Sequence, residues 1–551
     1  MKVKKSIWIA GIGAVVLLAG VLLPTLAYRA QDEKPVADIE IAATEVTLER
    51  NGAEAFSNVA PLTAEEHQQL FEELHALRLE MARKKVLVPG PAEAIAPTAI
   101  PETSPAAPGE ALPAPSALYI GTNMVFTPVG RGASTHAEPA VANSGAKWFG
   151  TQNWTRGYSN NAGATWTTIA NDSGPPDAPY FCCDQDAIHD HGRDATIWTE
   201  VFLDSKSITG VVRFHVRNAN NLSDSCTYDL NTSGTRYDYP KLGVGNNFVY
   251  LSTNTLTGGT SWAGAQMWRY NLDQMATCAS SLSGSVFTWT GSVGQVVFTP
   301  AKNTTDTMYM VTIEHSNQNR YFWWPENSGT VSSKVLTVES SNFGAATCKG
   351  GISGSNWLGD PLSTSSVGYQ VFSAVGHDNG GGGKAPGSTD TEYLATYYTV
   401  ADNGTARPQA YAAGTIVRTS DMTVLNFADI WNSTSCFGYP RVAANSRGDL
   451  GLSIGFGSSK TGGGPVQGYV GISDDYSRSG IRGHFGGVSL VATGNDNPNR
   501  YGDYLSISAQ EPVDVAFIAA TLGDNSGKPN TRLVELLRGR YAQAYLDRRL
   551  K

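Results

Sequence analysis

Apolar and polar positions form three successive patterns along the chain. An apolar run without charges covers residues 6–27, apolar positions recur with a helical period over residues 70–81, and short apolar runs separated by turn residues continue from about 118 to 540. The first pattern predicts a segment that enters a membrane, the second an amphipathic helix, and the third many short strands. The sequence therefore predicts a large all-β region behind two short N-terminal elements.

The N-terminal apolar segment, residues 1–27, predicts export. Lysines among residues 1–5 precede the apolar run, as the basic region of a signal peptide or anchor does. Pro24 and the small residue Ala27 near the end of the run indicate a cleaved signal peptide, whereas its length, close to the ~20 residues that span a bilayer, slightly favours a retained anchor. In both interpretations the lysines stay in the cytoplasm, so the rest of the chain is extracytoplasmic.

Residues 28–117 are predicted to connect this segment to the β region. Residues 28–62 show no period and are expected to be irregular, and a capping box (Thr-Ala-Glu-Glu) opens a helix over 63–86. The apolar stripe of this helix indicates packing on the membrane or on the main domain, with self-association into an oligomer as the alternative. Residues 87–117 are rich in Pro and Ala and predict an extended linker, which we expect to hold the β region away from the membrane.

A repeated strand pattern predicts the architecture of the β region. Residues 138–142, 238–244 and 438–443 each combine a polar or aromatic residue with Pro and continue as an apolar strand, and Pro is tolerated at the first position of a strand. Strand starts recur near residues 137, 181, 238, 297, 369, 438 and 501. This spacing suits four-stranded blades with long loops, so we predict a β-propeller over 118–540, with seven blades or, as the alternative, six. A C-terminal tail follows over 541–551.

Three short motifs add a family resemblance. Residues 159–166 (Ser-Asn-Asn-Ala-Gly-Ala-Thr-Trp) match the Asp-box pattern Ser-x-Asp-x-Gly-x-Thr-Trp, with Asn161 where Asp is usual. The first predicted strand carries Glu138-Pro139, and the last carries Arg-Tyr-Gly-Asp-Tyr over residues 500–504. In these motifs the chain resembles exported bacterial members of the sialidase-like, or Asp-box, β-propeller superfamily. The resemblance implies the fold, because an Asp-box lies on the outer rim of a blade.

A closed ring of repeats brings equivalent positions together at its axis. We therefore expect polar residues at the starts of the innermost strands to converge, with their charges facing water in a central funnel. The candidate catalytic residues are Asp184, Asp186, Asp238, Asp503 and Tyr504. The candidate ligand-binding residues are Glu138, Tyr239, Lys241, Arg441 and Arg500. Such a set can perform acid/base chemistry on a glycosidic bond, bind a sugar without reacting, or chelate a hard cation.

Two classes of function fit these features. The first is a non-catalytic recognition or scaffold module, whose partner is a glycan or a cell-surface protein. The alternative is a carbohydrate-active enzyme, either a sialidase-like glycoside hydrolase or a polysaccharide lyase. The Arg-Ile-Pro motif of sialidases is absent, and the nearest segment is Tyr439-Pro440-Arg441, which favours the first class. A net charge of -9 without a basic stripe argues against a nucleic-acid partner.

The cysteines also fit an exported protein. All six lie in the β region, and an even number in an oxidising compartment predicts disulfides, although the sequence leaves their pairing open. Side chains of neighbouring strand residues point to opposite faces, so one of Cys182 and Cys183 is expected to pair elsewhere or stay buried. The alternative is a disulfide between the two, which requires a distorted backbone. No Cys-x-x-Cys pair is present, so we predict no metal site and no cofactor, with a structural calcium ion left open.

Overall fold

A computed structural model gives the three-dimensional structure of the chain. It describes residues 39–51, 102–103, 117–126, 138–153, 155–169, 174–218, 225–259, 261–290, 299–315, 317–339, 348–350, 355–358, 372–377, 392–404, 406–445, 448–459, 461, 464–474, 483–485, 487–494, 505–510, 515–525 and 528–542. The N-terminal segment 1–27, the helix expected over 63–86 and the candidate residues Arg500, Asp503 and Tyr504 lie outside these ranges. None of the helices formed by the described residues is long and apolar enough to cross a membrane.

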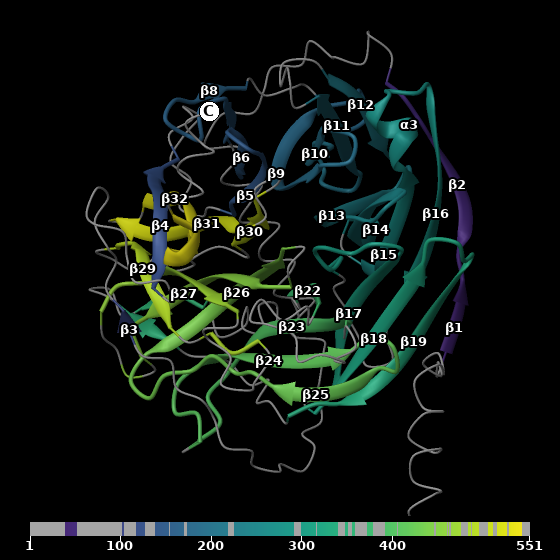
Figure 1. Ribbon diagram of the computed structural model, residues 1–551. Helices are drawn as coiled ribbons and strands as arrows, with labels where there is room; N and C mark the ends of the chain where they lie inside the picture. Colours follow the sequence, from purple (N-terminus) through teal and green to yellow (C-terminus); the bar gives the residue numbers. More distant parts are fainter. Residues whose placement is uncertain are drawn as a thin grey trace, which may run out of the picture.

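The described strands form antiparallel sheets that follow one another around a central axis (Figure 1). In sequence order the groups of strands are β5 (Ala140–Ser144), β6 (Lys147–Gln152), β7 (Thr155–Ser159) and β8 (Thr167–Thr168); β9 (Tyr180–Asp190), β10 (Ala195–Leu203), β11 (Gly210–Asn218) and β12 (Ser225–Leu230); β13 (Thr235–Val244), β14 (Phe248–Thr257), β15 (Ser261–Asn271) and β16 (Ser281–Trp289); β17 (Thr307–His315), β18 (Gln318–Pro325) and β19 (Thr330–Thr337); β22 (Phe372–His377), β23 (Glu392–Val400), β24 (Tyr411–Arg418) and β25 (Thr423–Phe427); β26 (Cys436–Ala444), β27 (Leu450–Gly457), β28 (Gln467–Ser473) and β29 (Val488–Ala492); and β30 (Ser506–Ala509), β31 (Ala516–Asn525) and β32 (Lys528–Arg538). The predicted all-β propeller is confirmed, and the number of its blades stays a prediction.

The sheets stand face to face around the ring, so their inner strands are buried on both sides, whereas outer strands such as β8 and β25 are partly exposed. Every position of β26 and of β27 is buried. One apolar cluster joins side chains of β22–β25, such as Tyr397, to side chains of β26–β29, such as Leu452 and Val488. Burial on both faces explains why these strands read as continuous apolar runs rather than as an alternation of apolar and polar residues.

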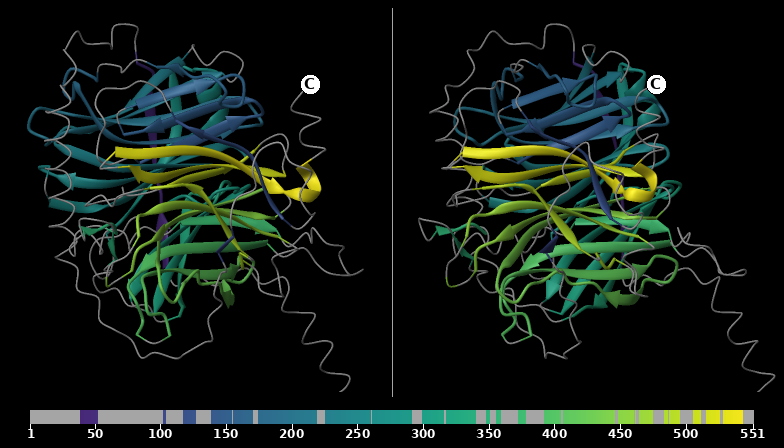
Figure 2. Two further views of the ribbon diagram at one scale, coloured as in Figure 1. Left: turned by 90° about the vertical axis from the view of Figure 1, so that its left-hand side faces the viewer. Right: turned by 60° about the vertical axis from the view of Figure 1, so that its left-hand side comes forward.

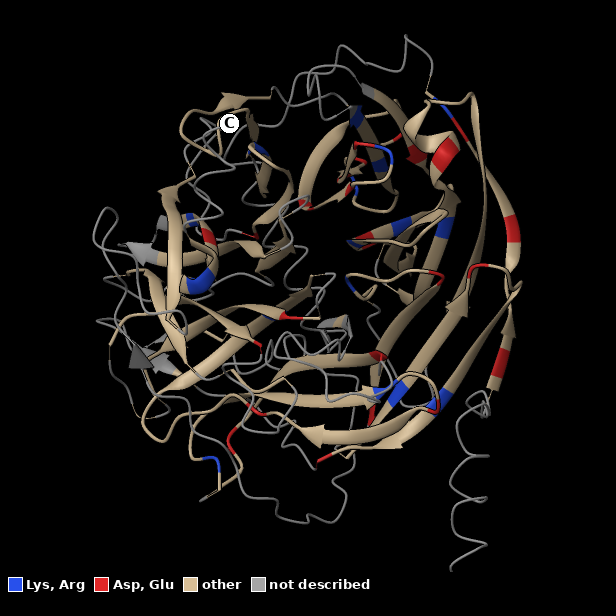
Figure 3. Ribbon diagram, in the orientation of Figure 1, with Lys and Arg blue, Asp and Glu red and all other residues tan. Residues whose placement is uncertain are grey.

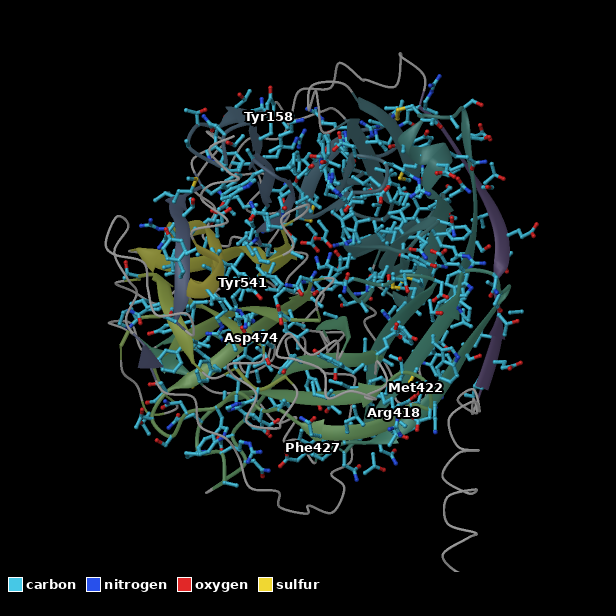
Figure 4. All side chains as sticks on the ribbon, in the orientation of Figure 1. Tyr158, Arg418, Met422, Phe427, Asp474 and Tyr541 are labelled. Carbon is cyan, nitrogen blue, oxygen red and sulfur yellow. A yellow bond between two sulfur atoms is a disulfide. The ribbon has the colours of Figure 1, made fainter. Side chains whose placement is uncertain are left out.

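The ring closes through a strand from the N-terminal side of the domain. Strand β4 (Leu118–Val125) pairs antiparallel with β32 and so joins the sheet of β30, β31 and β32, the last strands of the chain. Figure 2 shows this C-terminal sheet, in yellow, between the blue and the green sheets. Arg538 of β32 donates two hydrogen bonds, of 2.8 and 2.9 Å, to the buried carboxylate of Asp474 (Figure 4), which follows β28. These contacts tie the two ends of the domain to each other and to the preceding sheet.

Residues 39–51, which we call the strap, lie along the outer edges of two sheets. Strand β1 (Ile39–Ala42) pairs with β19, and β2 (Thr44–Glu49) pairs with β16. The expectation that residues 28–62 are irregular is therefore wrong for 39–49. The strap alternates, with Val46 and Leu48 facing the protein and the intervening residues exposed, which is the pattern of a strand on a sheet edge. A two-residue strand of the predicted linker, β3 (Glu102–Thr103), likewise pairs with β29.

Three disulfides account for all six cysteines. Cys226 of β12 pairs with Cys278, which follows the short helix α3 (Leu272–Ala276), and Cys348 pairs with Cys436 at the start of β26. The favoured expectation, that one of Cys182 and Cys183 pairs elsewhere or stays buried, is wrong, and the alternative holds: the two adjacent residues form a disulfide with each other. Both lie where β9 departs from regular strand pairing, so the rule that neighbouring side chains point to opposite faces does not apply to them.

The turn that carries the Asp-box resemblance gives a first prediction. The Asn161 side-chain oxygen accepts the N–H of Thr165 at 2.9 Å and the hydroxyl of Ser159 at 2.9 Å, and its amide donates to the Thr165 hydroxyl. We expect Asn161→Asp to change the free energy of unfolding by less than about 0.5 kcal/mol, since a carboxylate keeps both accepted bonds. Asn161→Ala should cost about 1–2 kcal/mol. Urea denaturation of both variants checks this, and equal losses would contradict it.

Candidate functional site

Strand β13 is bulged where its candidate residues lie. Asp238 stands opposite Asn254 of β14 and Lys241 stands opposite Ser252, so Tyr239 and Pro240 together face a single residue. Tyr239 has a left-handed φ of 56°, a conformation that bulky residues rarely adopt. A β-bulge bends a strand and changes the direction of its side chains. The bulge therefore separates the orientation of Asp238 from that of Lys241.

The same irregularity occurs in β26 and β9. In β26 Tyr439 and Pro440 together face a single residue, Ile454, and Tyr439 has a φ of 55°. In β9 the extra residues are 182–184, which include the disulfide between adjacent cysteines. The three inner strands thus share one departure from regular pairing, and in each case charged residues follow it. Backbone strain of this kind is concentrated at functional sites.

The Asp186 carboxylate lies where basic side chains of several sheets meet. It accepts the N–H of Leu242, on β13, at 2.8 Å, and Arg441 Nη2, on β26, lies 3.9 Å from it. Burial would raise the pKa of Asp186, but three basic groups and the backbone N–H outweigh burial and lower it below its usual value. The basic groups, in order of decreasing effect, are Lys302, Lys241 and Arg441. Asp186 is therefore ionised at neutral pH. We call Asp186 and these three residues the axial cluster.

Both lysines of the axial cluster are shifted towards the neutral form. Burial lowers the pKa of Lys241 to about 8, although the carboxylates of Asp186, Asp184 and Glu138 act in the opposite direction. Burial also lowers the pKa of Lys302 to about 8, opposed by Asp186. Each ammonium group donates to a backbone carbonyl, at 3.1 Å for Lys241 and 2.9 Å for Lys302. The ammonium groups of Lys241, which is buried, and of Lys302, which is half-buried, thus share one carboxylate with a guanidinium group.

The expectation that these charges face water in a funnel is wrong. The exposed fraction lies between 0 and 3 % for Glu138, Asp184, Asp186, Asp238, Tyr239, Lys241 and Arg441. Figure 3 shows charged positions of the inner strands around the centre of the ring. The bulges direct these side chains towards neighbouring inner strands, so that carboxylates of one sheet and cations of another enclose each other. Charges paired in this way can be buried, whereas isolated charges cannot.

The sequence indicated part of this cluster and missed part. Asp186, Lys241 and Arg441 are candidate residues that the structure brings together. Lys302 is not among the candidate residues. Pro300 precedes it by two residues and lies near a predicted strand start, which is the same Pro-containing pattern as in residues 238–244 and 438–443. Its segment lies along β17, since the Ala301 N–H donates to the carbonyl of Tyr309 at 2.9 Å. This strand-like segment is short and irregular, which is why its signal was weak.

A second buried cluster joins the first two sheets. Arg156 of β7 forms an ion pair with Glu200 of β10, and His215 of β11 lies 2.7 Å from the other Glu200 oxygen. The His215 ring stacks on Trp198, with 4.1 Å between centroids. Burial, followed by the charge of Arg156, lowers the pKa of His215 well below its usual value, so the imidazole is neutral. The cluster fixes one sheet against the next and was not predicted.

A third cluster lies between β19 and the sheet of β22–β25. Arg407 donates to Asp429 at 2.7 Å and to Glu339 at 3.1 and 3.2 Å. Burial, and then the Asp429 carboxylate, raise the pKa of Glu339 to about 7. Burial also raises the pKa of Asp429. Two carboxyl groups thus share one guanidinium group. Among the residues that the structure describes, no group of three or more His, Cys, Asp or Glu side chains could hold a metal ion.

Comparisons with sequences of known proteins find no relative. No protein-family model matches the chain, and no curated protein matches it. The resemblance to the Asp-box superfamily therefore stays a resemblance in the motifs of residues 138–139, 159–166 and 500–504.

Comparisons with solved structures find proteins of very low sequence identity. A sialidase from Streptococcus pneumoniae is 9% identical, with a TM-score of 0.36 over 60% of this chain and 67% of that chain. An α-L-arabinanase from Penicillium chrysogenum is 9% identical, with a TM-score of 0.36 over 76% and 99% of the two chains. An apocarotenoid oxygenase from Synechocystis is 10% identical, with a TM-score of 0.35 over 66% and 73%. At these values the similarity assigns no activity to the chain.

Proposed function

We propose that the protein is an extracytoplasmic β-propeller, tethered to a membrane by its N-terminal segment, that acts as a recognition or scaffold module with a glycan as its ligand class. Export is supported by the basic and apolar N-terminus together with the three disulfides, which persist in oxidising compartments. The glycan is the ligand class that the family resemblance implies.

The burial of the axial cluster carries the non-catalytic part of this proposal. A general acid or base must reach the proton of a bound substrate, at hydrogen-bond distance or through one water molecule. The candidate carboxylates Asp184, Asp186 and Asp238 are instead buried, and Asp186 is engaged by cations from other strands. This arrangement favours a role in holding the inner strands together over a role in turnover.

The alternative, a carbohydrate-active enzyme, has one observation in its favour. Lys241 and Lys302 have pKa values lowered to about 8 beside ionised carboxylates, and the bulges next to Lys241 and Arg441 contain strained tyrosines. Shifted ionisable groups that converge from distant parts of a chain are typical of functional sites, although structural ion-pair networks also produce them. An enzyme would require the axis to open when substrate binds.

A screen separates the two functions. We expect the purified protein to bind acidic or complex glycans on an array and to show no turnover with glycosidase and lyase substrates, because its candidate carboxylates Asp184, Asp186 and Asp238 are buried. Asp184→Asn and Asp238→Asn are the informative variants, and Asp273→Asn, at an exposed position, is their matched control. Turnover that Asp184→Asn and Asp238→Asn both abolish and the control retains would contradict the non-catalytic proposal.

A further inference from the structure

The strap is held by three successive groups of strands. Its first strand pairs with β19 and its second with β16, as described above. Beyond β2, Arg50 forms a β-bridge with Tyr228 of β12 and donates to the carbonyl of Cys278 at 2.7 Å, and the Asn51 amide donates to the Thr227 hydroxyl at 3.0 Å. The strap is therefore part of the folded ring and not a free N-terminal extension.

The position of the strap in the sequence limits how far the ring can be from a membrane anchor. Eleven residues, 28–38, separate the end of the apolar segment at Ala27 from the first strap residue, Ile39. Fully extended, eleven residues reach about 40 Å at most. The linker over 87–117 follows the strap and precedes β4, so it connects two parts of the ring to each other. It cannot lengthen the connection between the membrane and the strap.

We propose that the strap, and not the Pro-rich linker, sets the distance between the ring and the membrane, so that the rim formed by the strap, β16 and β19 faces the bilayer within about 40 Å. This corrects the role expected for the linker as a spacer from the membrane. The inference rests on the tethered form of the proposed function.

The charges on the strap determine whether this rim is attracted to the lipid head groups. Glu40, Glu45 and Glu49 are exposed on the strap, and Arg50 is its single basic residue, so acidic side chains outnumber basic ones. Anionic lipid head groups repel such a surface, because membranes attract basic and not acidic segments. The tether therefore holds the strap rim close to the bilayer without adsorbing it.

Energy transfer to a head-group-labelled lipid tests the geometry, using the full-length chain in vesicles of neutral lipid. The donor is placed at exposed positions, by Thr47→Cys on the strap or by Val125→Cys on β4 across the ring (Figure 1). We expect stronger transfer from residue 47 than from residue 125. A flexible Gly/Ser insertion within 28–38 should lower the transfer from residue 47, and the same insertion within 87–100 should leave it unchanged.

The outcomes separate this inference from the proposed tether. If the chain stays with the vesicles after a high-salt wash and the linker insertion lowers the transfer as much as the 28–38 insertion does, the strap does not set the distance and only this inference fails. If the mature chain begins at Tyr28 or later and leaves the vesicles, both the tether and the inference fail. Equal melting temperatures of the two insertion variants and the parent chain show that the strap stays in place.

Discussion

Asp186→Ala is expected to lower the free energy of unfolding by about 3–5 kcal/mol at pH 7, the range for removing one partner of a buried ion pair. The substitution leaves Lys241, Lys302 and Arg441 without the carboxylate that links them across the ring. The lysines can lose their protons, but Arg441 cannot, so it stays charged in a buried position. It also leaves the Leu242 N–H, which Asp186 accepts at 2.8 Å, without this acceptor. Urea denaturation of the purified protein measures the loss.

A matched control shows whether the loss of stability depends on the burial of the ion pair or only on the removal of a charge. Asp273 also pairs with an arginine, Arg193, at 2.5 Å, but its side chain is 74 % exposed. Asp273→Ala should therefore change the free energy of unfolding by less than about 1 kcal/mol, as exposed ion pairs do. Equal losses for the two alanine variants would show that the axial cluster contributes no more than a surface pair does.

A second substitution tests whether the loss of stability comes from the cations that Asp186→Ala leaves without a carboxylate. Replacing Lys302 by Met in the Asp186→Ala background removes one of the charges left without a carboxylate. We expect the double variant to be more stable than Asp186→Ala alone, with a coupling energy of about 1–3 kcal/mol between the two positions. If the losses in the free energy of unfolding are additive, Lys302 and Asp186 do not interact.

The sequence predicted the ring because the fold depends on a signal that recurs along the chain. Strand starts that repeat at blade spacing, with Pro ahead of an apolar run, define the meanders and place their first strands at the axis. The strap was missed because its alternation covers only four and six residues and is broken between the two strands at Ala42 and Ala43. Such a strand forms on the edge of a completed sheet, and its partners lie far away in the sequence.

For three of the ten candidate residues, the sequence indicated that they converge but not the environment in which they do so. Asp186, Lys241 and Arg441 follow the repeated strand pattern, so their convergence could be read from the repeat. The burial of these side chains could not be predicted from the repeat, because it depends on bulges that change side-chain direction. The pair of Arg156 and Glu200 shows the same limit, since each residue lies within a strand whose sequence carries no sign of its partner in another sheet. Charge pairs between sheets are a property of the assembled ring.

Raising the pH from 7 to about 10 is expected to stabilise the protein, by up to about 3 kcal/mol for each axial lysine. Burial lowers the pKa of Lys241 and of Lys302 from 10.5 to about 8 in the folded chain, whereas the unfolded chain keeps the usual value. Between pH 8 and 10.5 the unfolded state therefore binds more protons than the folded state, and stability rises with pH. The contribution is fully present above 10.5 and is lost as the pH falls through 8.

Buried tyrosines set the upper limit of this window. Burial raises the pKa of eight of the described tyrosines, among them Tyr237 and Tyr321, the latter to about 12, so their ionisation favours the unfolded state as the pH approaches 10. Urea denaturation at intervals from pH 7 to about 9, below the range in which the tyrosines ionise, measures the rise, and Lys302→Met should remove about half of it. Lys206→Met, at an exposed turn, is the control and should leave the profile unchanged. A profile that is flat or falls over this range in the parent chain would contradict the buried, partly neutral state of both lysines.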